Sequence, residues 1–118
     1  MSWITTPSLW LAEQALNLAA VRHSLIAGNM ANIDTPHFHT RDIDFQGELR
    51  RALMEIDSEN LSPVVRDVQG LMERPDGNNV SLEREGLALA DAQLRYRLGV
   101  EILRSEFRRL SVAINEGK

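Results

Sequence analysis

Apolar residues in the first part of the chain recur at alternating spacings of three and four, which indicates one face of a helix. We predict this helix over residues 7–34, because Pro7 is tolerated in a first turn and Pro36 disfavours helical geometry just before it. The main apolar face comprises Leu9, Ala12, Leu16, Ala19, His23, Ile26, Met30 and Ile33. A second apolar row beside it comprises Leu11, Ala15, Leu18 and Leu25.

The last part of the chain repeats this pattern and predicts a second long helix over residues 81–116. Ser81 is a suitable N-terminal cap, and Gly117 is a suitable stop. The main stripe comprises Leu82, Leu89, Tyr96, Leu103 and Leu110, widened on one side by Val100, Phe107 and Ile114. A separate apolar row comprises Leu87, Leu94, Leu98 and Ile102.

Between these helices the pattern breaks up, and residues 35–79 are predicted to form an irregular, turn-rich segment. It contains a short extended piece near Asp42–Phe45 and a short helix near residues 46–56. The run Pro75-Asp76-Gly77 is a strong turn signal. The predicted fold is therefore mainly α-helical: a single domain over residues 1–118, built as an elongated helical hairpin or coiled coil of the two terminal helices.

A hairpin of two helices buries one stripe of each helix and leaves the second row of each in water. A soluble monomer rarely exposes a continuous apolar strip of that length. Two explanations remain open at this point. Other subunits cover the two rows, or the middle segment folds over them within a monomer.

Composition excludes several classes of protein. A hydrophobic fraction of 43% is too high for a disordered chain, and the absence of cysteine rules out disulfides and thiolate metal sites. The net charge of −4, concentrated in residues 41–79, argues against a nucleic-acid partner. We also expect no membrane insertion and no cleavable signal peptide, since neither pattern occurs in the sequence.

Candidate chemistry is sparse. His37 and His39 lie close in sequence, but no third metal ligand is apparent beyond Asp42 or Asp44, so we expect no metal and no cofactor. The two aspartates are expected to be solvated or paired to an arginine such as Arg41. No nucleophile, base and orienting group can be assembled, and we therefore expect no enzymatic activity.

Two blocks of polar residues at the edges of the middle segment carry a more specific signal. The first follows the pattern N-x-A-N-x-x-T and comprises Asn29, Ala31, Asn32, Asp34, Thr35, Pro36, Phe38, Arg41, Asp42, Asp44 and Phe45. The second comprises Pro75, Asp76, Gly77, Asn78 and Asn79, followed by Gln93, Leu94, Arg95 and Tyr96. Both blocks, in this order, resemble the flagellar axial protein family of rod, hook and hook-associated subunits, and its proximal rod proteins in particular.

The resemblance covers nearly the whole chain and implies a structural subunit of the bacterial flagellar rod. It implies helical assembly with further copies, with rod proteins of the FlgC and FlgF type, and with FliE and the export gate. It also implies synthesis in the cytoplasm and export to the periplasmic rod. The interfaces would comprise the two stripes and the two second rows defined above.

The sequence departs from the family at two positions, where His37 replaces the usual glycine and His39 the usual basic residue. Glycine at the first position suggests a backbone conformation that histidine adopts less readily. The alternative function that remains open is a helical-hairpin adaptor or chaperone-like module of a flagellar or type III export system.

Overall fold

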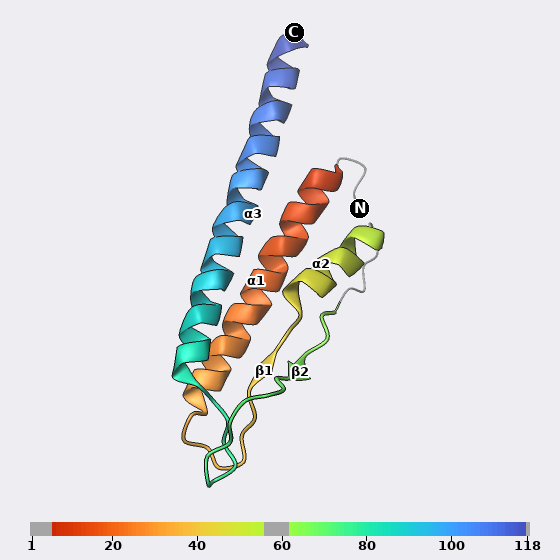
Figure 1. Ribbon diagram of the computed structural model, residues 1–118. Coiled ribbons are helices and arrows are strands. Elements are labelled where there is room, and N and C mark those ends of the chain that lie inside the picture. Colours follow the sequence, from red (N-terminus) through yellow and green to blue (C-terminus); the bar gives the residue numbers. More distant parts are fainter. Residues whose placement is uncertain (1–5, 56–61, 118) are drawn as a thin grey trace.

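The computed structural model describes residues 6–55 and 62–117, and its described part is dominated by helices α1 and α3 (Figure 1). The helix α1 spans Pro7–Ala31, and Thr6 caps it because its Oγ1 accepts a hydrogen bond from the Leu9 amide at 3.1 Å. This helix ends three residues before the predicted boundary of 34. The chain turns at Asn32, whose amide bonds to the Gly28 carbonyl at 3.1 Å and whose side chain donates to the same oxygen at 2.8 Å.

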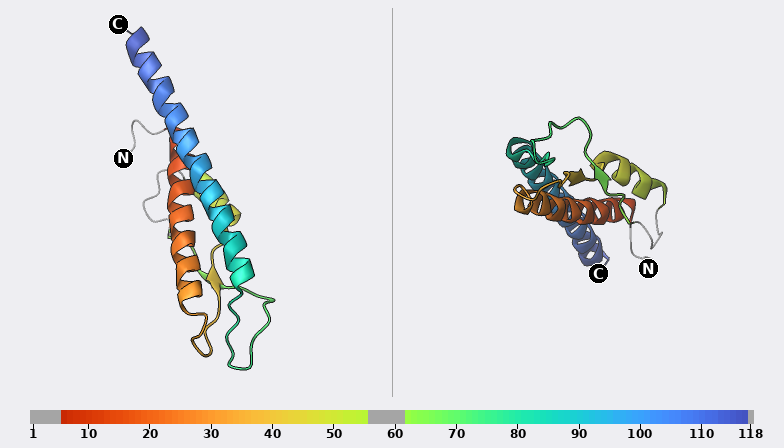
Figure 2. Two further views of the ribbon diagram at one scale, coloured as in Figure 1. Left: turned by 90° about the vertical axis from the view of Figure 1, so that its left-hand side faces the viewer. Right: turned by 90° about the horizontal axis from the view of Figure 1, so that it is seen from below.

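The helix α3 spans Leu82–Glu116 and runs antiparallel to α1, extending well past the start of α1 (Figures 1 and 2). Its cap is Ser81, whose Oγ accepts from the Arg84 amide at 3.2 Å. At the other end Gly117 is the C-cap, with a right-handed φ of −76° and a hydrogen bond to the Ala113 carbonyl. The whole molecule measures 68 × 24 × 18 Å, so it is elongated as the two helices require.

The middle segment contains the helix α2, Phe45–Met54, and two short strands, β1 at Arg41–Asp42 and β2 at Arg66–Asp67, paired antiparallel. Asp44 caps α2 by accepting from the Gly47 amide at 3.2 Å. The helix starts one residue before the predicted 46–56, and residue 56 lies outside the described residues. We call β1 and α2 together, residues 41–54, the arm.

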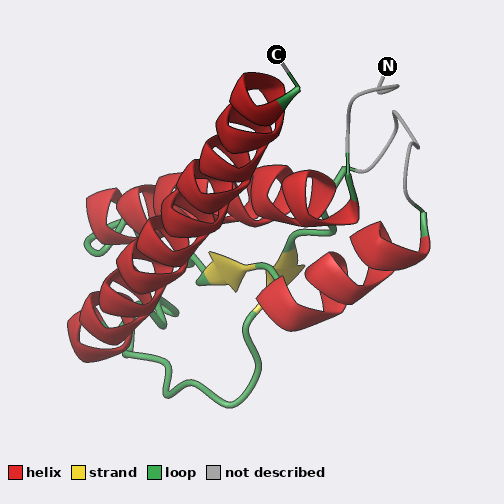
Figure 3. Ribbon diagram, turned by 90° about the horizontal axis from the view of Figure 1, so that it is seen from above, coloured by secondary structure: helices red, strands yellow, loops and turns green. Residues whose placement is uncertain are grey.

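The arm packs on α1 and covers part of its second apolar row. Leu18 and Ala19 form a buried cluster with Ile43 and Phe45 of the arm, and Leu25 packs against it. The far end of α2 is held by Trp10, whose indole Nε1 donates to the Ala52 carbonyl at 3.0 Å. Figure 3 shows the result, with α3 crossing α1 and α2 lying beside α1. The sequence left two explanations open for how the second apolar rows are covered. For the row on α1, the middle segment of the same chain covers it.

The seam between α1 and α3 is made of small side chains. A second buried cluster joins Ile26 of α1 to Ala88 and Ala92 of α3. Further along, a Cβ placed on Gly99 lies only 3.0 Å from the Leu16 side chain, so the two helices approach closely there. The separate row of α3 remains uncovered in the described structure, because Leu87 is 70% exposed and Leu94 57% exposed.

Candidate functional site: paired loops, a polar node and an open apolar row

The two sequence blocks with the family pattern lie side by side at the end of the hairpin, although they are some forty residues apart in sequence (Figure 1). Backbone bonds pair the two loops: the His37 amide donates to the Asp76 carbonyl at 2.9 Å, and the Asn79 amide donates to the Phe38 carbonyl at 3.3 Å. The Arg74 guanidinium also joins the two loops, because it donates to the Val80 carbonyl at 3.2 Å and to the Ile33 carbonyl.

Two asparagines of the second block complete the pairing. Asn78 is fully buried, and its side-chain amide donates to the carbonyls of Asn32 and Thr35, both at 2.9 Å. Those carbonyls follow the end of α1, and each also accepts a backbone hydrogen bond within the first loop, from the Thr35 amide at 3.1 Å and from the Phe38 amide at 3.3 Å. Asn79 accepts from the Thr40 amide at 2.7 Å, which fixes the start of the arm. An amide suits position 78 because its nitrogen donates to these carbonyls while its oxygen accepts from the Val80 amide at 2.8 Å.

The departure at His37 has a structural counterpart. His37 is the only residue besides glycine with a positive φ in the described chain, at 65°, which is the left-handed conformation that glycine adopts without strain. Gly77 faces it with a φ of 84°, and a Cβ there would lie 2.7 Å from His37 Nδ1. The expectation drawn from the sequence, that this position favours glycine, agrees with the observed backbone.

Asn29 connects three elements near the end of α1. Its side chain donates to the Arg41 carbonyl at 2.9 Å and accepts from the Arg41 amide at 3.1 Å. The backbone of a neighbouring β-strand makes the same pair of hydrogen bonds. It also donates to Glu85 Oε1 of α3 at 2.9 Å. Asn29 and Glu85 are almost wholly buried, with exposed fractions of 1% and 0%. This one amide therefore joins α1 to both the arm and α3.

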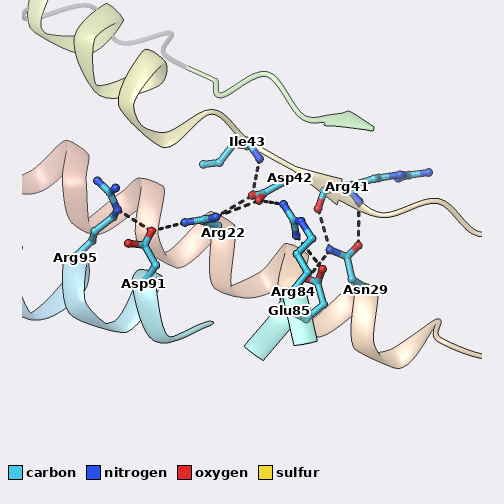
Figure 4. Close-up of polar contacts among 9 residues, drawn as sticks. All are labelled: Arg22, Asn29, Arg41, Asp42, Ile43, Arg84, Glu85, Asp91 and Arg95. Carbon is cyan, nitrogen blue, oxygen red and sulfur yellow. Dashed lines mark hydrogen bonds and ion pairs between the residues drawn. The ribbon is translucent and has the colours of Figure 1, made fainter. Parts of the chain in front are cut away.

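Asp42 of the arm lies between two arginines from different helices (Figure 4). Arg22 of α1 donates to both carboxylate oxygens, at 3.1 and 3.2 Å, and Arg84 of α3 donates to Oδ2 at 2.6 Å. The Ile43 amide adds a fourth bond, to Oδ1, at 2.7 Å. Asp42 is thus paired to arginine, as one of the two expectations had it, but its partners are Arg22 and Arg84 and not Arg41, which is exposed. Asp44 is exposed to solvent.

The ion pairs extend in both directions from Asp42. Arg84 also bonds Glu85 at 2.8 Å, and Arg22 also bonds Asp91 at 2.6 Å. Asp91 accepts from Arg95 at 2.9 Å, and the Arg95 guanidinium lies 4.5 Å from the Phe45 ring centre. We call this set the polar node, and it comprises Arg22, Asn29, Asp42, Arg84, Glu85, Asp91 and Arg95. Its three cations balance its three anions.

The environment shifts the pKa of three members of the node. Burial alone would raise the pKa of Asp42, but the hydrogen bonds from Arg22 and Arg84 outweigh it and hold the pKa below the ordinary value. The hydrogen bond from Arg95 is the main reason that the pKa of Asp91 is lowered, with Arg22 adding to it. For Arg22, burial would lower the pKa, yet its bonds to Asp42 raise it overall. All three groups are therefore charged at neutral pH.

The open face of α3 is the most apolar exposed surface described. Its separate row is exposed along its length, and beyond the start of α1 the helix continues with Phe107 at 58% and Ile114 at 59% exposure. On the side of α1 away from the arm, a groove of about 500 Å³ follows the seam, bordered by His23 and Tyr96. Such surfaces are typical of contacts with other protein.

The structure places the residues predicted for the motif and the interfaces in four environments. The paired loops contain Asn32, Asp34, Thr35, Pro36, Phe38, Pro75, Asp76, Gly77, Asn78 and Asn79, and the node and arm contain Asn29, Arg41, Asp42, Asp44, Phe45 and Arg95. The side chains of α1 are buried or half-buried at Leu9, Leu11, Leu16, Leu18, Ala19, Leu25 and Ile26 and exposed at Ala31 and Met30, and Ile33, in the turn after α1, is half-buried. On α3, Leu89, Val100 and Leu103 are half-buried, and Leu82, Gln93, Leu94, Tyr96, Leu98, Ile102, Phe107, Leu110 and Ile114 are exposed.

Four of the seven residues of the node were not predicted from the sequence: Arg22, Arg84, Glu85 and Asp91. Arg22 is the single lysine or arginine among the first forty residues, and nothing in the pattern singles out Arg84 or Asp91. Glu85 lies in the first turn of α3, where a carboxylate is favourable to the helix dipole, but it is also fully buried against Asn29. A charged residue on the otherwise apolar side of a helix, as Arg22 is, was the one available sign of a buried partner.

Within the described part of the chain, no group of three histidine, aspartate or glutamate side chains is placed to hold a metal ion. His39 Nε2 lies 3.8 Å from Glu73, and both side chains are largely exposed. A search of residues 6–55 and 62–117 finds no helix with the length and hydropathy to cross a membrane.

Known proteins resemble this chain over almost its full length. No protein-family model matches it. It is 31% identical to the flagellar basal body rod protein FlgB of Salmonella typhimurium, with 93% of this chain and 94% of that protein aligned. The FlgB proteins of Borrelia hermsii and Yersinia ruckeri are each 30% identical, with at least 91% of this chain and 95% of each relative aligned. The chain belongs to the FlgB family of flagellar basal body rod proteins.

Proposed function

We propose that this protein is a structural subunit of the flagellar basal body rod. Its similarity to rod proteins named FlgB over more than nine-tenths of both chains is the observation that carries the proposal. The open apolar row of α3 and the length of α3 beyond α1 support it, since both offer surface to neighbouring protein. A structural role of this kind requires no catalytic step, and we propose none.

The proposed subunit is a single domain that assembles helically with further copies through α1 and α3. Its work is to form part of a driveshaft that transmits torque. Dense helix seams suit that task, because close-packed side chains yield little under load. Here Ala19, Ala92 and Gly99 line the seam, whereas Ala27 is exposed and nothing lies within 4 Å of a Cβ on Gly28.

The proposed location is the periplasmic base of the rod, after synthesis in the cytoplasm and export without a cleavable signal peptide. The proposed neighbours are further copies, rod proteins of the FlgC and FlgF type, and FliE with the export gate. Neither nucleic acid nor an inserted membrane segment has a part in this role. An adaptor or chaperone-like module of an export system is the weaker hypothesis, because the relatives are named as rod proteins.

The test uses the exposed row on α3. Leu94→Asp adds a charge at a position that is 57% exposed, so the fold of the free chain should be unchanged. In an assembled rod, the same charge would have to be buried without a partner, at a cost of several kcal/mol. We expect loss of swimming and loss of the subunit from purified basal bodies, in a bacterium whose own copy has been deleted.

Asn17→Asp is the matched control, because it adds the same carboxylate at an exposed, polar position of α1. It should swim normally, and both variants should show the circular dichroism and urea midpoint of the unaltered chain. Normal swimming and normal incorporation of Leu94→Asp would contradict assembly through this row. Absence of the unaltered protein from purified basal bodies would instead contradict the rod subunit itself.

A further inference from the structure

The seam between α1 and α3 nearly repeats itself along the helix axis. On α1, the buried positions Ala12, Ala19 and Ile26 are seven apart, and on α3 the facing positions Glu85, Ala92 and Gly99 are also seven apart. Seven residues are two turns of helix, so a slide by that interval returns each helix to the same face. The contacts that would be exchanged are mostly between small side chains. Packing along this seam therefore distinguishes one register from the next at Gly99, where a slide would bring the side chain of Ala92 or Glu106 against Leu16, and only weakly elsewhere.

The polar node distinguishes the registers strongly. A slide of seven residues is about 10 Å, which would separate Asn29 from Glu85 and Arg22 from Asp91. In the observed register these pairs are joined at 2.9 and 2.6 Å. Glu85 is fully buried, and a slide would take the Asn29 amide away from its Oε1 and leave only Arg84 of the same helix as its partner, which is costly for a buried carboxylate. A single buried polar group can select the register of paired helices in this way.

The node also joins the register to the arm. Asp42 belongs to the arm, yet Arg22 of α1 and Arg84 of α3 both donate to it. These two arginines reach the same carboxylate only when the helices are in the observed register. We propose that the polar node fixes the axial register of α3 against α1 and makes it interdependent with docking of the arm. The length of α3 that extends beyond α1 is set by the same contacts.

Cysteine cross-linking can read the register directly, because the chain contains no cysteine of its own. A Cβ on Gly99 lies 3.1 Å from Leu16 Cγ, so Leu16→Cys with Gly99→Cys should form a disulfide in the observed register. Two further pairs report a slid register. Leu16→Cys with Ala92→Cys should form a disulfide after a slide of seven residues in one direction, and Leu16→Cys with Glu106→Cys after a slide of seven residues in the other. In the observed register these partners are displaced by about 10 Å along the axis, beyond the reach of a disulfide.

Each cysteine pair is placed in four backgrounds. The first is the unaltered node. The second is Asn29→Leu with Glu85→Leu, which replaces a polar pair by an apolar one, also removes the two bonds of Asn29 to Arg41, and should keep the helices folded. The third is Asp42→Asn. The control is Glu101→Gln, which removes an exposed ion pair with Arg104 on the same helix, outside the node. Circular dichroism at 222 nm reports the helix content of each.

With the unaltered node and in the control, we expect the observed-register disulfide to form at least about tenfold faster than either slid pair. In the variant with both Asn29→Leu and Glu85→Leu, the slid pairs should form their disulfides at rates within about threefold of the rate of the observed-register pair. A double variant that keeps its helix content and still forms only the observed-register disulfide would overturn the proposal, because packing alone would then set the register.

The link to the arm has its own readout. Trypsin cleavage after Arg50 and Arg51 of α2, measured by mass spectrometry of the native protein, reports release of the arm. Asp42→Asn should raise this cleavage and the slid cross-links together, each by at least about threefold. A rise in cleavage with an unchanged cross-link pattern would overturn the interdependence of arm and register. Unchanged trypsin cleavage in Asp42→Asn would also overturn this interdependence.

Discussion

Replacing Asp42 by asparagine removes one negative charge from the centre of the node with almost no change in shape. In the folded chain its carboxylate accepts four hydrogen bonds, two from Arg22 and one each from Arg84 and the Ile43 amide. Its side chain is 10% exposed, and those of the two arginines are 15% and 24% exposed. Solvent therefore screens these interactions only in part, unlike those of a surface ion pair.

Removing one partner of a buried ion pair costs about 3–5 kcal/mol. Here the loss should be smaller, because Arg22 keeps Asp91 and Arg84 keeps Glu85. The amide oxygen of the variant can also still accept one of the four bonds. We therefore expect Asp42→Asn to lower the free energy of unfolding at pH 7 by about 2–3 kcal/mol.

The pH dependence of this effect follows from the lowered pKa of Asp42. Because the folded pKa lies below the unfolded value of 3.8, the charged form stabilises the fold at every pH above 3.8. That contribution is lost as the pH falls through the folded pKa. The difference between the unaltered chain and Asp42→Asn should thus be constant from pH 7 to about pH 5 and shrink below that.

The assay is urea unfolding followed by circular dichroism at 222 nm, at pH 7 and at half-unit steps down to pH 3. Asp44→Asn is the control, since Asp44 is an exposed helix cap and asparagine caps about as well as aspartate. It should change the free energy of unfolding by less than about 0.5 kcal/mol. A loss below about 1 kcal/mol for Asp42→Asn at pH 7, or a difference that stays the same at pH 3, would refute the reasoning.

Two further predictions concern the backbone and the seam. His37→Gly should raise the free energy of unfolding by about 0.5–1 kcal/mol, because a φ of 65° strains histidine and leaves glycine unstrained. Urea unfolding measures it, and a decrease would mean that the side chain of His37 contributes more than its backbone costs. Gly99→Val should lower the same free energy by about 1–3 kcal/mol through overlap with Leu16, whereas Gly86→Ala, which meets nothing within 4 Å, should raise it by about 0.5–1 kcal/mol. Equal effects of these two changes would show that the seam is loosely packed at Gly99.

The sequence predicted the helical architecture well because helices leave local traces. The cap Ser81 precedes α3 as expected, and Pro36 lies just past the end of α1. The motif loops could be recognised but not placed, since hydrogen bonds such as the one from Asn78 to the Asn32 carbonyl join segments distant in sequence. Periodicity reveals which residues share a face, but it does not reveal what that face meets.

That limit explains the main differences between the predicted and the observed packing. The leucines at seven-residue spacing on α3 suggested the seam, yet the most buried positions of α3 are Glu85, Ala88, Ala92 and Gly99. Small side chains carry little hydrophobic signal, but they allow the closest approach of two helices. A buried glutamate gives even less warning, because its burial depends on an asparagine far away in the chain.

The distance along the chain between α1 and α3 has a consequence for how the protein folds. Residues 32–81 separate the two helices, so the contacts of the seam and the node have high contact order. Folding of such contacts is slow, because a long loop must close before they form. During synthesis, which proceeds from the N-terminus, Arg22 and Asn29 emerge long before Arg84, Glu85 and Asp91. The hairpin can therefore close only after most of the chain has been made, and until then α1 exposes the face that α3 will cover.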